Sequence, residues 1–303
     1  MKEEMIKKIE KLFLEGKITE EVKEKLIKEI EDMDEKKYEE KLKGSFKNIE
    51  IELISEDLEI KGSEDINEIV FEKGKDSVEI DESDDKLIIK SKNRGVHINV
   101  FGFKIGDEIT TENLKIVVPS NSNVIVNDIT GDIEVKNIKG NLKIKTVSGD
   151  IELKDIQGDV DCYTLSGDIS IENLNGNFKI NSKSGDIFAN DIEDGGIIKT
   201  YSGDIRIKYG NFERLLLSTF SGDQRLENIK INDLMEIHTI SGDINLSILT
   251  KDLKIEVDTK SGEGSIEHEG KITKVNKGEV KIGEGDKILR IKTLSGDINI
   301  DID

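Results

Sequence analysis

The sequence has little of what usually anchors a globular core or cross-links a chain. Its 303 residues include no tryptophan, one cysteine and one proline, and aromatic residues make up 4%. A single cysteine excludes an intramolecular disulfide, and so few aromatic side chains argue against a core built around them. No stretch approaches the roughly 18 consecutive apolar residues of a membrane-spanning helix, so no integral membrane segment is predicted. The apolar surface must come from Ile, Leu and Val, which suit stacked β-strands.

Positive charge is outnumbered by negative charge. Lys and Arg number 45 against 65 Asp and Glu, which gives a formal net charge of −20. Nucleic acid is an unfavourable partner because affinity for phosphate backbones depends on clustered cations, and an anionic lipid surface is disfavoured for the same reason. The opening MKEEMIKKIEKLFLEG lacks the uninterrupted apolar segment of a signal peptide. We therefore expect an acidic protein that is cytoplasmic, or peripheral to a membrane.

A nine-residue repeat begins at Gly131. The chain reads GDIEVKNIK, GNLKIKTVS, GDIELKDIQ, GDVDCYTLS and GDISIENLN in succession. The third, fifth and eighth positions are apolar, as in Leu142, Ile144 and Val147, and the alternation at the first two is typical of a strand with one buried face. The leading Gly with Asp or Asn is turn chemistry. Each unit is expected to be one strand and one turn, with these three positions facing inward.

Alternate turns share a stricter pattern, T-x-S-G-D, which recurs after 18 and later after 19 or 20 residues. This period predicts a mainly β protein: a single-stranded β-solenoid of the parallel β-helix or β-roll type, with about 18–20 residues per coil. Stacking would place Thr above Thr and Asp above Asp along one edge. The residues expected in this turn ladder are Thr146, Ser148, Gly149, Thr164, Ser166, Gly167, Ser184, Gly185, Thr200, Ser202, Gly203, Thr239, Ser241, Gly242, Thr293, Ser295 and Gly296.

The regular solenoid is expected over residues 127–303, with different patterns at its two ends. Residues 45–126 alternate less strictly and are expected to form irregular coils or a cap on the stack. Residues 1–44 show a helical period and predict a small helical hairpin, with Thr19 as the N-cap of its second helix. At the other end, LRIKTLSGDINIDID finishes with a strand that nothing follows. Its outer edge is expected to be bare or paired with another chain.

Three motifs resemble a known family. L-K-I-V-V-P at 114–119, the repeated T-x-S-G-D-I-x-L and the terminal L-R-I-K-T-L-S-G-D-I-N-I are similar, over residues 45–303, to the prokaryotic "putative adhesin" domain of unknown function, a β-solenoid. The segment L-F-L-E-G-K-I-T-E-E-V-K-E-K-L resembles the SHOCT-like helical module that often precedes such solenoids. The resemblance implies no catalytic residues, association through the hairpin and a link to cell-envelope stress.

A column of aspartates is the most suggestive chemical feature. Stacked carboxylates repel one another unless something compensates them, and calcium, which prefers oxygen ligands, is one candidate. The alternative is that each carboxylate accepts hydrogen bonds from turn amides. The chain lacks the GGxGxD motif of calcium β-rolls. The aspartates concerned are Asp132, Asp150, Asp168, Asp186, Asp204, Asp223, Asp243 and Asp297.

Other chemistry has weaker support. His97, His238 and His268 have no paired spacing, which argues against zinc, and Cys162 is at an inward position, where a free cysteine is usually a small buried hydrophobe. Carboxylate pairs suited to glycan cleavage arise here by repetition alone. We expect a non-catalytic binding or assembly scaffold without a cofactor, which associates with a protein partner or with itself, as a homo-oligomer, through the hairpin. A calcium-binding β-roll and a polysaccharide-active β-helix enzyme are the alternatives.

Overall fold

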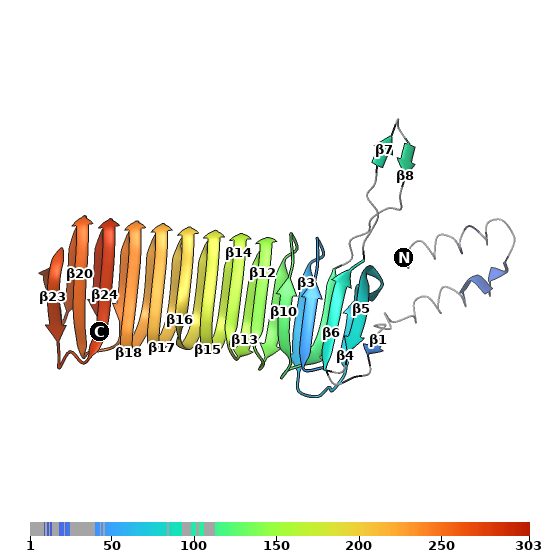
Figure 1. The fold of residues 1–303 in the computed structure, drawn as a ribbon, viewed down its shortest axis with the longest axis horizontal. Helices are drawn as coiled ribbons and strands as arrows, with labels where there is room; N and C mark the ends of the chain where they lie inside the picture. Colours follow the sequence, from blue (N-terminus) through green and yellow to red (C-terminus); the bar gives the residue numbers. More distant parts are fainter. Residues whose placement is uncertain are drawn as a thin grey trace. The chain divides into compact units, whose positions relative to one another are not determined.

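The computed structural model describes residues 9, 11, 13, 18–20, 22–24, 40–42, 44, 46–83, 85–92, 98–100, 103–105 and 113–303. The chain divides into two compact units, Met1–Glu40 and Lys41–Asp303. The second unit is a β-solenoid, a long and mostly parallel stack of coils (Figure 1). The prediction of a solenoid is therefore confirmed.

Each coil contributes one strand segment to each of two faces of the stack, and in some coils the two segments are the halves of one long strand. Face 1 contains, in stacking order, β6 (Lys86–Ser91), β2 (Asn48–Glu52), β10 (Asn123–Asn127), β12 (Leu142–Ser148), β14 (Val160–Ser166), the C-terminal halves of β15 (Ile169–Ser184), β16 (Ile187–Ser202), β17 (Ile205–Ser221) and β18 (Gln224–Ser241), then β24 (Lys287–Ser295) and β20 (Leu253–Ser261).

Face 2 is built in the same way and in the same order. It contains β9 (Leu114–Pro119), β3 (Leu58–Ser63), β11 (Ile133–Ile138), β13 (Ile151–Gln157), the N-terminal halves of β15 to β18, β19 (Ile244–Ile248), β25 (Ile298–Ile302) and β21 (Gly264–His268). The chain passes from face 1 to face 2 at the Ser-Gly-Asp turns, which we call the SGD corner. It returns to face 1 at the opposite corner.

Successive coils stack in register at the SGD corner. Thr146 pairs with Thr164, and Thr164 with Ser182, at a separation of 18 residues. The later intervals of 19 and 20 residues arise at the opposite corner, where the register shifts between Asp194 and Gly195 and again between Phe212 and Arg214. The additional residues therefore form bulges and do not add a third strand.

The interior is a column of aliphatic side chains. The third and fifth positions of the units face inward as predicted, for example Ile151 and Leu153, and Cys162 is fully buried. The eighth position behaves differently on the two faces. Ile138 on face 2 is buried, whereas Val147 on face 1 is 46% exposed, so its inward assignment was wrong.

This difference has a backbone cause. On face 2 the seventh residue of six successive units adopts a left-handed conformation, which turns the next side chain inward. On face 1 the strand stays regular, so strict alternation places the seventh residue inside and the eighth outside. The left-handed residues form a column of their own: Asn137, Asp155, Asn173, Asp191, Tyr209 and Asn228.

The two ends of the stack are closed by strands that run in reverse. At the N-terminal end β4 (Ile69–Lys73) is antiparallel to β9, and β5 (Val78–Ser83) to β6, with a short 3₁₀ helix, η1 (Lys75–Ser77), between them. At the C-terminal end β22 (Lys271–Lys274) is antiparallel to β21, and β23 (Lys277–Ile282) to β20. Lysine side chains occupy both ends of β22, which discourages pairing at an open edge.

The last coil of the chain does not lie at the end of the stack. Strand β24 inserts between β18 and β20, and β25 inserts between β19 and β21. The expectation that the final strand leaves an outer edge bare, or paired with another chain, was therefore wrong. The first coil is inserted in the same way, because β2 lies between β6 and β10 and β3 between β9 and β11.

The remaining elements are short. Strands β7 (Ile98–Val100) and β8 (Phe103–Ile105) pair only with each other in the described residues, and β1 spans Glu40–Leu42. Most of the helical hairpin expected over residues 1–44 lies outside the described residues, as does His97. Among those described, the Lys23 N–H donates to the Thr19 carbonyl at 2.9 Å and the Val22 N–H to Thr19 Oγ1 at 3.4 Å, which confirms Thr19 as an N-cap. No described helix is long and apolar enough to cross a membrane.

Candidate binding ridge

The SGD corner is held in shape by the close approach of successive glycines. A Cβ atom on Gly203 would lie 2.1 Å from the carbonyl oxygen of Gly185, and one on Gly185 would lie 2.1 Å from that of Gly167. Real Cβ atoms do not approach a carbonyl oxygen so closely, so glycine is required at these turns. The threonines of the motif face inward beside these turns and are buried. The Thr200 hydroxyl donates to the Gly185 carbonyl at 3.2 Å.

The aspartates of the motif form a continuous ladder of hydrogen bonds. The backbone N–H of Asp186 donates to Asp168 Oδ1 at 2.7 Å, and that of Asp204 donates to Asp186 Oδ1 at 2.8 Å. The same bond links all the predicted aspartates, including Asp297 to Asp243 at 2.8 Å. At the two ends of the ladder, the Asp132 N–H donates to Asp57 Oδ1 at 3.1 Å and the Glu263 N–H donates to Asp297 Oδ1 at 2.8 Å. The first of these was missed because residues 55–57, Ser-Glu-Asp, lack the glycine of the motif.

Each aspartate of the ladder thus has one oxygen engaged by the backbone of the neighbouring coil. Among the described residues, no group of three or more His, Cys, Asp or Glu side chains is placed to hold a metal ion. Burial raises the pKa of the Cys162 thiol, which keeps this side chain protonated and unreactive at neutral pH.

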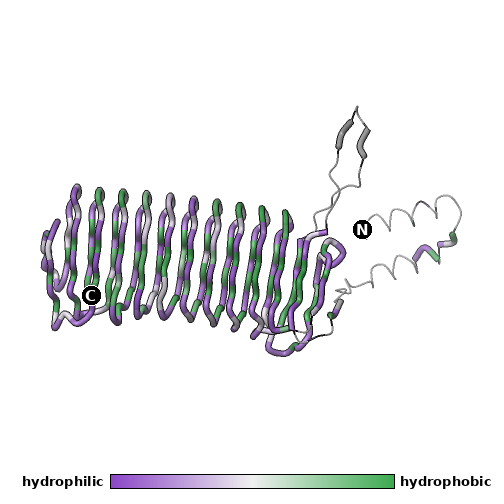
Figure 2. The backbone as a smooth tube through the Cα atoms, in the orientation of Figure 1, coloured by the Kyte–Doolittle hydropathy of each residue, from purple (hydrophilic) through white to green (hydrophobic). Residues whose placement is uncertain are grey.

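A row of mostly apolar side chains lies at the face 1 end of the SGD corner. It consists of the residue two positions before the corner glycine in each coil, which is the variable residue x where the motif is T-x-S-G, so its members are stacked one coil apart. In Figure 2 hydrophobic residues colour the upper turns of many coils green. In stacking order the row reads Ile129, Val147, Leu165, Lys183, Tyr201, Phe220, Ile240, Leu294 and Lys260.

Four consecutive members of this row form its longest run of exposed apolar side chains, which we call the ridge. Tyr201, Phe220, Ile240 and Leu294 are 56%, 44%, 41% and 47% exposed, and the rings of Tyr201 and Phe220 stack with centroids 4.7 Å apart. Isolated exposed apolar residues are common on proteins, but contiguous ones usually mark a contact surface. The ridge is therefore the strongest candidate for a functional site.

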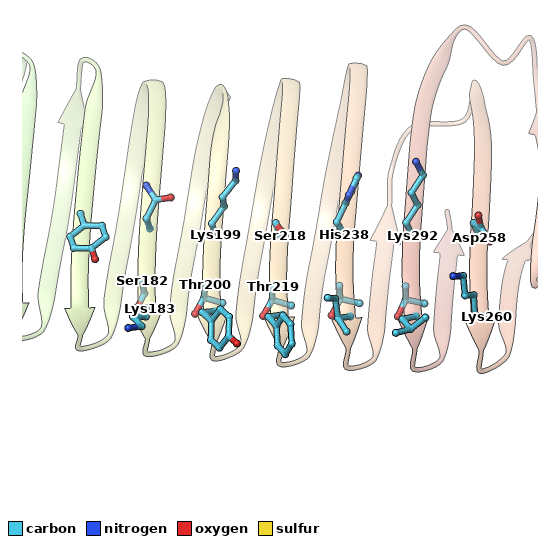
Figure 3. A pocket seen from close by; sticks show the side chains of 18 residues that line it. Ser182, Lys183, Lys199, Thr200, Ser218, Thr219, His238, Asp258, Lys260 and Lys292 are labelled. Atoms are coloured by element: carbon cyan, nitrogen blue, oxygen red, sulfur yellow. The ribbon is translucent and has the colours of Figure 1, made fainter.

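Lysines lie at both ends of the ridge and along its face 1 side. Lys183 and Lys260 occupy the row at its two ends, and Lys199 and Lys292 lie in the adjacent row on face 1 (Figure 3). These side chains and the ridge line an open groove of about 770 Å³. Among the described residues none of these four lysines has an ion-pair partner, whereas Arg290 on the same face is paired with Glu256, at 2.7 Å, and with Glu236. The groove is thus locally basic within an acidic chain.

The groove holds few groups suited to catalysis. Asp258 supplies the one carboxylate among its described lining residues, and His238 lies in the row between Ser218 and Lys292. Burial lowers the pKa of His238, and the nearby Lys292, Arg290 and Lys199 lower it further against the opposing effect of Glu236. The ring is therefore expected to be neutral at pH 7. The arrangement offers apolar and cationic contacts rather than a pair of groups for acid–base chemistry.

The ridge was not found from the sequence. The eighth position was expected to face inward in all units, as for Val147, so no exposed row was predicted there. The available signal was the threonine in the seventh position of alternate units, since an inward Thr on a regular strand requires an outward neighbour.

Comparisons with known proteins identify the domain. A family model described as Toastrack DUF4097 matches residues 46–301. Among solved structures, a "putative lipid binding protein" of Parabacteroides distasonis is 13% identical, with a TM-score of 0.36 over 87% of this chain and 95% of the other. A "putative cell adhesion protein" of Clostridium sporogenes is 11% identical, with a TM-score of 0.18 over 86% and 94%. No curated protein gives a significant match.

Proposed function

Since the chain belongs to the Toastrack DUF4097 family, a domain of unknown function, we propose from its surface that it is a non-catalytic scaffold whose ridge binds a partner polypeptide. The observation that carries this proposal is the run of four exposed apolar side chains framed by Lys183, Lys199, Lys260 and Lys292. Buried apolar anchors with a polar rim are how protein interfaces obtain affinity.

The geometry gives less support to the two alternatives considered above. A calcium β-roll needs several oxygens that converge on one ion, whereas each ladder aspartate directs one oxygen at a backbone amide. A glycan enzyme needs two carboxylates about the substrate. The groove beside the ridge supplies Asp258 alone among its described lining residues, and the carboxylates of a second groove on face 2, such as Glu134 and Glu152, recur at the same position of successive coils, as repetition alone produces. The rings of Tyr201 and Phe220 also stack on each other, which leaves less of their faces for a sugar.

We further propose that the N-terminal segment, residues 1–44, mediates assembly of the scaffold with a second copy or another protein. Its support is the amphipathic pattern of the sequence. A helical hairpin of this size buries little apolar surface by itself, so its apolar face is expected to need a partner for stability. Sedimentation velocity of the full chain tests this part. A concentration-dependent dimer that dissociates when Leu26, a residue of the expected apolar helical face, is replaced by Lys would support assembly with a second copy, and a monomer at all concentrations would contradict self-association.

Site-specific photo-crosslinking tests the binding function. A photoreactive phenylalanine analogue is placed at position 220 on the ridge or, as a control, at Ile272, which is 62% exposed on β22. In cells that express the full chain, we expect a discrete protein adduct from position 220 and none from position 272. If position 220 gives no protein adduct, or only the pattern obtained at 272, the proposal is wrong.

A further inference from the structure

The spacing of the ridge restricts the shape of the polypeptide that fits it. The four apolar side chains lie on neighbouring parallel strands, so they recur about every 4.8 Å along the solenoid axis. The apolar stripe of an α-helix recurs about every 5.3 Å, at 3.5 residues of 1.5 Å each. Same-face side chains of an extended strand recur only about every 6.7 Å.

These repeats decide between the two conformations. Over the three intervals of the ridge, the apolar stripe of a helix laid along the solenoid axis falls out of register with the ridge side chains by about 1.5 Å, which side-chain rotation can absorb. An extended segment drifts by about 6 Å, more than one whole strand spacing. The ridge therefore matches a helix and not an extended peptide.

The charges around the groove define the polar residues of that helix. Lys199 and Lys292 lie on the face 1 side of the ridge, and Lys183 and Lys260 lie at its ends, five strand spacings or about 24 Å apart. A helix of about 16 residues has this length. On the other side of the ridge the aspartate ladder follows, with Asp204 and Asp223 nearest to Tyr201 and Phe220 in sequence. Carboxylates are favoured on one flank of the helix and disfavoured on the other.

We propose that the ridge binds an amphipathic α-helix of a partner protein, laid along the solenoid axis, with an apolar stripe, an acidic flank toward Lys199 and Lys292, and a neutral flank toward the aspartate ladder. This inference rests on the proposed function, because it specifies the polypeptide that the scaffold binds. The apolar side chains supply most of the affinity, and the charges set which helix binds and in which direction.

Fluorescence anisotropy with three labelled peptides of about 18 residues tests the proposal on the full chain. The first has a leucine stripe, glutamate on one flank and glutamine on the other. The second carries lysine in place of each glutamate, and the third scrambles the first so that no stripe remains. We expect binding of the first peptide alone. Equal binding of the first two, or binding of the scrambled peptide, would overturn the inference.

Protein variants locate the binding and supply the matched controls. Phe220→Ser with Ile240→Ser should weaken binding of the acidic peptide at least tenfold, while the exposed control Ile272→Ser should leave it unchanged. Lys199→Glu with Lys292→Glu should abolish binding of the acidic peptide and confer binding of the lysine peptide, whereas Lys208→Glu on face 2 should do neither. All these side chains are exposed, and an unaltered Tm will show that each variant is folded.

Other occupants of the ridge give distinct results. Ridge-dependent binding to phosphatidylglycerol vesicles without peptide binding, or a dimer that the Phe220→Ser and Ile240→Ser substitutions dissociate, would overturn the helix proposal in favour of a membrane or a second copy. Failure of all three peptides, together with a protein adduct from position 220, would reject the helix and leave the scaffold function standing.

Discussion

The two corners of each coil perform the same reversal and differ in how firmly they are fixed. At the SGD corner, amide-to-carboxylate bonds of 2.7–3.1 Å continue through every coil from Asp57 to Glu263. At the opposite corner a similar ladder of Asn and Asp has bonds of 3.0–3.3 Å and ends at Asn177. Beyond it the chain accommodates its insertions. One corner therefore keeps the coils in register, and the other absorbs changes of length.

The largest expected effect comes from inserting one residue at the SGD corner, and the same insertion at the opposite corner is its control. An alanine inserted between Ser184 and Gly185 displaces the glycine from its close approach and interrupts the ladder, so we expect a loss of more than about 3 kcal/mol. An alanine between Phe212 and Glu213, at the opposite corner, where the next coil already carries one more residue, should cost less than about 1 kcal/mol. Urea unfolding of the two insertions gives the comparison. Equal losses would show that the corners do not differ in this way.

Removal of one ladder carboxylate is expected to have the next largest effect. Asp168→Ala leaves the N–H of Asp186 without its acceptor and should cost about 1–2 kcal/mol, whereas Asp168→Asn retains an acceptor oxygen and should cost less. The matched variant at the other corner is Asp159→Ala, where the bond to the Asn177 N–H is 3.3 Å long. Chemical denaturation should rank Asp168→Ala as the most destabilising of the three. A larger loss from Asp159→Ala would reverse the assignment of the two corners.

Substitution of Tyr209 is expected to increase the stability of the protein, in contrast to the substitutions above. It occupies the left-handed column near the opposite corner with φ 57°, where the coils on either side have Asp191 and Asn228. Since this conformation is unfavourable for a bulky residue, Tyr209→Asn should stabilise the protein by about 1 kcal/mol. Tyr163→Asn, an exposed tyrosine on a regular strand, should not stabilise it. A Tm that does not rise in Tyr209→Asn would show that the column is not under strain.

The smallest expected effect depends on pH. Asp128 takes the place of Thr146 in an earlier coil, and burial raises its pKa, with Glu56 and Asp57 adding repulsion. A carboxyl whose pKa is raised by folding destabilises the folded state above that pKa, and the penalty disappears as the pH falls below the unfolded value of about 3.9. Asp128→Asn should therefore stabilise the protein at pH 7, by at most about 1 kcal/mol, and not at about pH 3.

Glu56 is the control for this pH dependence. Although burial pushes its pKa upward, hydrogen bonds from Ser91, Ser55 and Ile54 lower it overall. A lowered pKa stabilises the folded state above the unfolded value, and this contribution is lost as the pH falls through the folded pKa. Glu56→Gln should therefore destabilise the protein at pH 7 and less so in acid. Thermal melts of both variants from about pH 3 to pH 7 check the two signs, and curves that move together would contradict them.

Much of the fold could be predicted from the sequence because the solenoid repeats a local rule. The Gly-Asp turns, the inward third and fifth positions and the alignment of Thr146 with Thr164 follow from turn chemistry and strand alternation. The ridge was missed because Asn137 bends the backbone before Ile138, whereas no such residue precedes Val147. The insertion of β24 between β18 and β20 could not be inferred, because it depends on contacts between segments far apart in the chain.

The insertion of the first and last coils bears on how such a protein can change in size. A duplicated segment added after β25 or before β2 would find no free strand edge beside it to pair with, since β25 and β2 each already pair with a strand on both sides. A duplication within β10 to β18 would place new coils among neighbours of the same architecture and leave both closures untouched. Lineages of this domain should therefore lengthen from the middle, and the ridge should gain or lose one side chain with each coil added or lost within it.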